Sequence, residues 1–232
     1  MWALLNDAED AIEEIINNPK SMTINGITHS RQIFKWTTTE LKTVGIVPVT
    51  TTGSHLDTNY YIEVDESFAI ASDKASVVRT IGVKAADHVL ADVNEVWTQE
   101  EIDDGYAPDG TSANDARNDE DGNQIVTLGL KSNAKNKATT SANGYLQGFD
   151  WLIQRKVTAN TAIPSAVTTY MAAIRTDHGN ICTALDAASD MAAFIALHTT
   201  TYNEDEDGNI TVNVIAKTQS WTSDANVKAY RR

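Results

Sequence analysis

The residues best suited to binding a metal ion form the motif Asn203-x-Asp205-x-Asp207-Gly208. Its side-chain oxygens occupy the first, third and fifth positions of a calcium-binding loop, and the glycine stands at the sixth. The twelfth position is Val214, so the bidentate glutamate of such a loop is missing. A similar run, Asp119-x-Asp121-Gly122, has Arg117 where the first ligand would be. We therefore predict two polar turns, with calcium binding at about millimolar concentration as the open alternative.

Residues that could do covalent or acid–base chemistry are sparse. His178 and Cys182 are four apart on one predicted helix and could supply two metal ligands, but no further pair lies nearby. The sequence has no G-x-S-x-G turn and no phosphate-binding glycine loop. Paired acids such as Asp103 and Asp104 lie in polar stretches where nothing would raise a pKa for acid catalysis. We predict no catalytic residue, no metal site and no cofactor, hence a protein that is not an enzyme.

Composition narrows the classes of partner. The chain has 232 residues, of which 41% are hydrophobic, enough for a folded core. Its 32 acidic and 18 basic residues give a net charge of −14, which disfavours nucleic acids and anionic membrane surfaces as partners. The single cysteine excludes an internal disulfide. Acidic residues follow directly after the short apolar run at residues 1–5, so we expect neither a signal peptide nor a membrane span. We therefore expect the newly made chain to remain in a cytoplasm.

Residues 1–102 are predicted to form a strand-rich N-terminal domain. Residues 2–5 and 11–16 suggest a hairpin, although the second run would also fit one helical turn. Asn25-Gly26 is the strongest short hairpin signal in the chain. Residues 60–64 and 68–71 alternate around Asp65-Glu66 and predict a further hairpin, whereas residues 77–96 fit either helix or strand.

Two short helices in this domain carry the same start signal. Thr37 with Glu40, and Thr98 with Glu101, have the spacing of a capping box, and each helix is followed by a glycine. A tryptophan precedes each threonine. The recurrence indicates either an internal duplication or, as we favour, two helices that need the same capping chemistry.

Residues 103–124 are rich in Asp, Gly, Ser and Asn and predict an acidic loop or linker before a C-terminal α+β module at 125–232. That module begins with a short strand at 125–130 and a helix at 131–147. Lys131, Lys135 and Lys137 lie on this helix and form either a solvated face or a contact with an acidic neighbour.

The stretch from Phe149 to Arg175 is the most informative part of the module. Alternation of Trp151 and Ile153 with Leu152 and Gln154 predicts a strand that ends at Lys156. Pro164-Ser165 then starts a helix, and Ser189-Asp190 caps a second one, giving a helical hairpin. Residues 199–202 and 210–215 predict a final β-hairpin, so the fold class of the whole chain is α+β.

Apolar residues of the first helix follow the alternating spacing of four and three that is typical of a coiled-coil seam. They are Val167, Met171, Ile174, Ile181 and Leu185, with His178 completing the pattern. The stripe predicts an oligomer interface between copies of the chain, or else a face buried within the chain by the module's own sheet.

The same stretch resembles a family of bacteriophage tail-associated proteins. The residues that carry the resemblance are D-W-x-x-x-R-K at 150–156, Ile163-Pro164 and Y-x-x-x-I-R at 170–175, together with Asn17-Asn18-Pro19-Lys20, Arg31-Gln32-Ile33-Phe34, Trp36-Thr37, Glu40-Leu41, Gly45-Ile46 and Trp97-Thr98-Gln99-Glu100-Glu101. The C-terminal segment is shared by tail-fibre assembly chaperones and virion structural proteins of marine phages, and the other segments resemble the longer marine-phage members. None of these motifs is catalytic in that family, so the resemblance implies a setting more than a mechanism.

The resemblance implies a structural protein of the tail, in a fibre, baseplate or neck, made in the host cytoplasm and carried in the virion. Its partners would be other tail proteins and further copies of itself, without nucleic acid or membrane. The alternative is a tail-fibre assembly chaperone that is absent from the mature virion. The strand-rich N-terminal region exceeds what a minimal chaperone needs, which favours the resident component. A third interpretation, calcium-assisted adhesion to a host surface, depends on the turn at 203–208.

Overall fold

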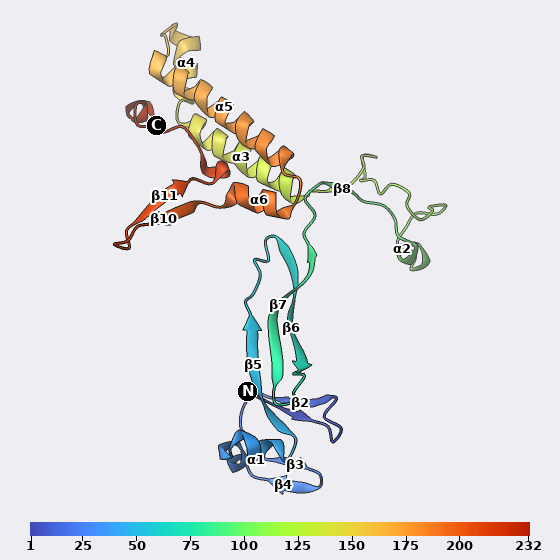
Figure 1. Ribbon diagram of the computed structural model, residues 1–232. Helices are drawn as coiled ribbons and strands as arrows, with labels where there is room; N and C mark the ends of the chain where they lie inside the picture. Colours follow the sequence, from blue (N-terminus) through green and yellow to red (C-terminus); the bar gives the residue numbers. More distant parts are fainter. The chain divides into compact units, whose positions relative to one another are not determined.

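The chain divides into two compact units, in a computed structural model that describes residues 1–232 (Figure 1). Unit 1 comprises Met1–Asp87 and unit 2 comprises His88–Arg232, and together they confirm the predicted α+β class. The boundary follows Asp87 and not residue 102 as predicted. The chain before it still belongs to the sheet of unit 1, whereas Val89 and Leu90 accept hydrogen bonds from residues 130 and 131 of unit 2. The acidic stretch 103–124 is thus a loop within unit 2 and no linker between units.

Unit 1 contains seven strands, one short α-helix and one 3-10 helix. They are β1 (Trp2–Leu5), β2 (Ile12–Ile16), β3 (Met22–Ile24), β4 (Ile27–His29), η1 (Arg31–Lys35), α1 (Thr38–Lys42), β5 (Ile46–Gly53), β6 (Tyr61–Ile70) and β7 (Val77–Asp87). Five strands form a mixed sheet in the order β2-β1-β5-β7-β6, in which only β5 and β7 run parallel. The middle strand β5 pairs with β1 up to Pro48 and with β7 from Val49 onward. Proline cannot donate a backbone hydrogen bond, which suits it to the position where a strand changes partner.

Both faces of the sheet are covered where β1 lies. Successive strand residues point to opposite faces, so Ala3 and Leu5 pack with Val47 and Val77, whereas Leu4 faces the other way. On that second face, β3, η1 and α1 supply four of the seven core residues, which are Leu4, Ile16, Met22, Ile24, Ile33, Leu41 and Ile46. The predicted hairpins around residues 6–10 and Asn25-Gly26 are confirmed, and both residues of the latter turn have positive φ, 48° and 77°.

The capping boxes are also confirmed. The Thr37 hydroxyl accepts from the Glu40 backbone N–H, and the Glu40 carboxylate accepts from the Thr37 N–H at 2.8 Å. Thr98 and Glu101 repeat the arrangement at the start of α2 (Gln99–Asp103). These helices have only five residues each, so hydrogen bonds to their first N–H groups contribute a large part of their stability.

The hairpin predicted around Asp65-Glu66 is wrong, because β6 runs through both residues as one continuous strand. It pairs along its length with β7, and the turn between them lies near Lys74, whose φ is 54°. Glu66 is ion-paired with Arg79 of β7 across the strand pair. β6 is an edge strand with exposed residues, so acidic side chains in its middle keep their hydration and do not break it.

Unit 2 contains the helices and two further strand pairs. Its elements are β8 (Val93–Asn94), α2, β9 (Val126–Thr127), α3 (Leu130–Gln147), α4 (Asp150–Ala159), α5 (Ser165–Ala187), α6 (Met191–His198), β10 (Thr201–Glu204), β11 (Ile210–Val214), η2 (Lys217–Gln219) and η3 (Lys228–Tyr230). α3 and α5 lie side by side (Figure 1). α3 buries Ala134, Ala138 and Ala142, one turn apart, and such small side chains let two helices approach closely.

The strand predicted at Phe149–Lys156 is wrong: Asp150–Ala159 is the helix α4. The buried residues are Phe149 and Leu152, which are three apart and share one face of a helical turn, whereas Ile153 is exposed. Asp150 in the first turn favours a helix N-terminus, and Asn160 ends the helix in the left-handed conformation. Trp151 is held by a hydrogen bond from its indole N–H to the Tyr230 carbonyl, a contact that the local alternation could not reveal.

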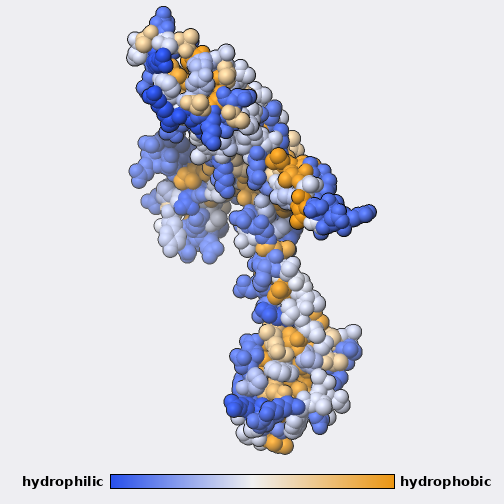
Figure 2. All heavy atoms as spheres, turned by 90° about the vertical axis from the view of Figure 1, so that its left-hand side faces the viewer, coloured by the Kyte–Doolittle hydropathy of each residue, from blue (hydrophilic) through white to orange (hydrophobic).

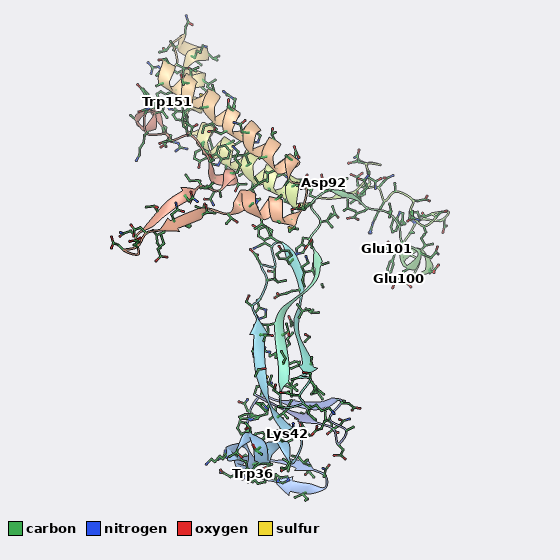
Figure 3. All side chains as sticks on the ribbon, viewed as in Figure 1. Trp36, Lys42, Asp92, Glu100, Glu101 and Trp151 are labelled. Atoms are coloured by element: carbon green, nitrogen blue, oxygen red, sulfur yellow. The ribbon has the colours of Figure 1, made fainter.

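Asp92 anchors the start of α3 to the segment that precedes β8 (Figure 3). Its carboxylate accepts from the Gly129 N–H and the Ser132 hydroxyl, both at 2.8 Å. These two donors hold the pKa of Asp92 below its usual value of 3.8. A carboxyl group whose pKa is lower in the folded state stabilises the fold above its ordinary pKa and ceases to do so as the pH falls through the folded value.

We therefore expect the protection of the Gly129 amide against hydrogen exchange to persist at neutral pH and to be lost only as the pH falls through the lowered folded pKa of Asp92. Asp92→Ala should remove that protection at every pH, because no other carboxylate accepts from this N–H. NMR-detected exchange measures it, with the Asn133 amide, which donates to the Gly129 carbonyl within α3, as the internal control. Equal protection of Gly129 in the wild type and in Asp92→Ala would contradict the anchoring role.

Candidate interaction surface

The chain exposes more surface than folding of its two units requires. Its accessible area is 15028 Å². Two separate compact proteins with the lengths of these units would expose about 12,300 Å² together. Taken separately, the two units therefore expose at least about 2,700 Å² more than compact proteins of their lengths, and Figure 2 shows apolar patches among hydrophilic residues. Surplus surface that includes exposed apolar patches is typical of proteins that pack against partners.

The β10–β11 hairpin is exposed along the whole length of both strands. All nine of its strand residues are exposed, and Figure 1 shows it extending away from α6, which it follows in the chain. Tyr202 lies opposite Val212 in the register. Tyr202, Ile210, Val212 and Val214 are between 55% and 67% exposed. A two-stranded hairpin is marginally stable alone, and these apolar side chains gain burial only from another surface.

The tip of this hairpin is strongly acidic. Glu204, Asp205, Glu206 and Asp207 are consecutive, and residues 199–216 contain no lysine or arginine. Asp205 holds the turn: its carboxylate accepts from the Asp207 and Asn209 N–H groups and from the Asn209 side chain. The Asn209 donors keep the pKa of Asp205 below its ordinary value, so the tip stays negative at neutral pH. The other three carboxylates are free to meet a partner.

The motif Asp119-x-Asp121-Gly122 forms the same type of turn as the tip of the β10–β11 hairpin. Asp119 accepts from the Asp121 and Asn123 N–H groups, as Asp205 does from Asp207 and Asn209. Both turns have the sequence Asp-Glu-Asp-Gly-Asn, and their glycines have φ of 83° and 79°. In each, the first aspartate is occupied by the chain's own N–H groups, as the prediction of polar turns requires. No group of three or more His, Cys, Asp or Glu is arranged around a possible metal ion.

Residues 94–127 form an arm of unit 2 that carries the second turn (Figure 3, where Glu100 and Glu101 are labelled). Arg117 holds it together: its guanidinium lies 3.1 Å from Glu101, 3.8 Å from Glu95 and 4.6 Å from the Trp97 ring centre. Trp97 is thereby a structural residue of the arm. The exposed apolar residues of this arm and its base are Val89, Val93, Val96, Tyr106, Val126 and Leu128.

The predicted oligomer interface is not on the surface. Val167, Met171, Ile174, Ile181 and Leu185 are at most 7% exposed and are buried within the chain. Val167, Met171 and Ile174 pack with Ala142 of α3, Phe149, Leu152 of α4 and Val227 near the C-terminus. Helices and the C-terminal segment, not the sheet we had proposed as the alternative, cover this face. Because these side chains are buried within the chain, the stripe offers no surface to a second copy.

The possible metal pair on α5 is a local contact. His178 and Cys182 lie 3.5 Å apart, and the Thr139 hydroxyl of α3 is 3.0 Å from the same imidazole nitrogen. Burial raises the pKa of the Cys182 thiol, so the thiol is protonated at neutral pH and is a poor nucleophile. Of the lysine cluster, Lys131 and Lys135 bind Asp186 at the end of α5, which is the acidic neighbour named as one alternative.

Sequence reasoning located the final hairpin but missed that it is unpartnered. The available signal was the charge pattern, four acids in a row beside an alternating apolar strand, which together suit recognition better than a buried core. No helix of the structure is both long and apolar enough to cross a bilayer. Comparison of the chain with protein-family models, with curated proteins and with solved structures finds no match in any of the three.

Proposed function

We propose that this chain is a non-enzymatic structural protein of a bacteriophage virion, sited in the tail at a fibre, baseplate or neck, and that it acts by packing against other proteins. The observation that carries the proposal is the surplus of exposed surface, about 2,700 Å² beyond two compact units. A standard interface takes about 800 Å² from each partner, so this surplus suffices for more than one contact. The phage setting is supported by the sequence resemblance, through residues such as Asp150, Trp151, Tyr170 and Arg175.

An assembly chaperone that leaves before maturation is the second candidate. The exposed apolar face of the β10–β11 hairpin favours it as well, because a chaperone also needs surface with which to hold a subunit. The two candidates differ in where the protein ends up. A structural protein stays in the particle, whereas a chaperone is found only in the infected cell.

Quantitative mass spectrometry of gradient-purified virions tests this. We expect the chain in intact particles at a fixed ratio to the major capsid protein, with an abundant host cytoplasmic protein as the control for contamination. Abundance in the infected lysate together with absence from the particles would support the chaperone. Absence from both would overturn both candidates.

A further inference from the structure

We propose that the β10–β11 hairpin of one copy docks on the β3–β4–η1–α1 region of a second copy, joining the chains head to tail. We call residues 17–45 the basic lobe. The inference rests on the proposed function, because it supplies the contact by which copies of a structural protein would assemble. The proposed contact does not use the helical stripe of α5, which is buried. It joins two surfaces that are both exposed, the β10–β11 hairpin and the basic lobe.

The basic lobe is positive in a strongly negative chain. Residues 17–45 contain Lys20, Arg31, Lys35 and Lys42 against a single acid, Glu40, a net charge of +3 within a total of −14. Glu40 is occupied by its capping box with Thr37. Lys20 is paired with Glu14, but Arg31, Lys35 and Lys42 have no carboxylate partner in the chain.

The lobe also exposes apolar side chains beside this charge. Ile27 is 63% exposed and points to the same side of β4 as His29. The His29 ring lies edge-on to the Trp36 ring, with 6.0 Å between their centres, and Trp36 is 44% exposed. Figure 3 shows Trp36 and Lys42 on this lobe. The lobe thus exposes the apolar side chains Ile27 and Trp36 as well as its unpaired cations.

The hairpin carries the complementary pattern. Its apolar face of Tyr202, Ile210, Val212 and Val214 leads to the tip Glu204–Asp207, which has four negative charges. Docking would bury apolar residues of both surfaces and bring the acidic tip to the unpaired cations. Complementary charge of this kind selects the partner and its orientation, while the apolar contact supplies most of the affinity.

Some other basic residues of the chain already contact groups of their own unit. Lys131 and Lys135 bind Asp186, Arg231 is paired with Asp224, and Arg232 stacks on Trp151 at 3.9 Å. Arg155 and Lys156 of α4 are also exposed without a carboxylate partner, but the lobe carries three such cations and a net charge of +3, which makes it the stronger attractor for the acidic tip. Since the two surfaces differ, the contact is heterologous, and its repetition produces a closed ring or an open filament according to the rotation between copies.

Charge reversal on each surface tests the proposal by sedimentation velocity of the full chain. The hairpin variant is Glu206→Lys with Asp207→Lys, and the lobe variant is Arg31→Glu with Lys35→Glu. We expect the wild type to self-associate more weakly as salt increases, and each variant to weaken association by at least about tenfold. The matched control is Glu120→Lys with Asp121→Lys, the same change in the identical turn of the arm, and it should associate as the wild type does.

An equimolar mixture of the hairpin and lobe variants gives the decisive measurement. In the mixture, the reversed tip of the hairpin variant meets the reversed lobe of the lobe variant, and the wild-type tip of the latter meets the wild-type lobe of the former. Association should therefore recover, which two misfolded variants could not achieve. Failure of the mixture to recover, equal weakening by the arm control, or a wild type that stays monomeric at about 100 µM in low salt would each overturn the proposal. None of these results removes the chain from purified virions, so the proposed function stands or falls separately by mass spectrometry.

Discussion

Replacing Ile174 by aspartate is expected to unfold unit 2 and not to release a folded monomer. Ile174 is 0% exposed and packs in the core formed by α3, α4, α5 and the C-terminal segment. Burying a carboxylate in this apolar cluster costs about 4 kcal/mol or more. Domains are stable by about 5–15 kcal/mol, so the loss would remove much of the margin.

Circular dichroism together with sedimentation measures this outcome, because the long helices all belong to unit 2 and report on its folding. The matched control is Val157→Asp, which introduces the same charge on α4 at a side chain that is 79% exposed. It should change the free energy of unfolding by less than about 0.5 kcal/mol. If Ile174→Asp kept its helical signal and merely sedimented as a monomer, the stripe would be an interface between copies after all.

The second large effect is expected at Gly82 in β7. Its φ is +70°, and a Cβ atom built there would lie 1.8 Å from the carbonyl oxygen of Ser54 and 2.8 Å from its carbon. Both atoms are backbone, so no side chain can move aside. Gly82→Ala adds the left-handed strain of about 1–2 kcal/mol to this clash, and we expect a total loss of about 3 kcal/mol or more.

Hydrogen exchange of the full chain, followed by mass spectrometry, locates the damage. Backbone amides of β5 and β7 should exchange faster in Gly82→Ala than in the wild type. Gly26→Ala separates strain from clash, because Gly26 has a similar φ of +77° with nothing within 4 Å of the added carbon. It should leave β5 and β7 unchanged. Wild-type exchange in β5 and β7 of Gly82→Ala would mean that the close approach of Ser54 is not required by the fold.

Elements encoded in a few consecutive residues were predicted from the sequence alone. The Asn25-Gly26 turn, the boxes of Thr37 with Glu40 and Thr98 with Glu101, and the final β-hairpin all appear as expected. Each depends on groups that are neighbours in the chain: a residue that tolerates positive φ, or an oxygen three positions from an unsatisfied N–H. The helix α5 follows for the same reason, since its pattern extends over many turns.

The tertiary structure decided everything that depends on a distant partner. The short alternation at 151–154 fits a strand or a helix, and packing of Phe149 and Leu152 in the core of unit 2 selects the helix. Asp65-Glu66 resembles a turn until β7 pairs along β6. The apolar stripe of α5 and the apolar face of the β10–β11 hairpin look alike in sequence. Only the fold buries the first and leaves the second exposed, because burial is set by which surfaces meet and not by the hydrophobicity of one strand or helix.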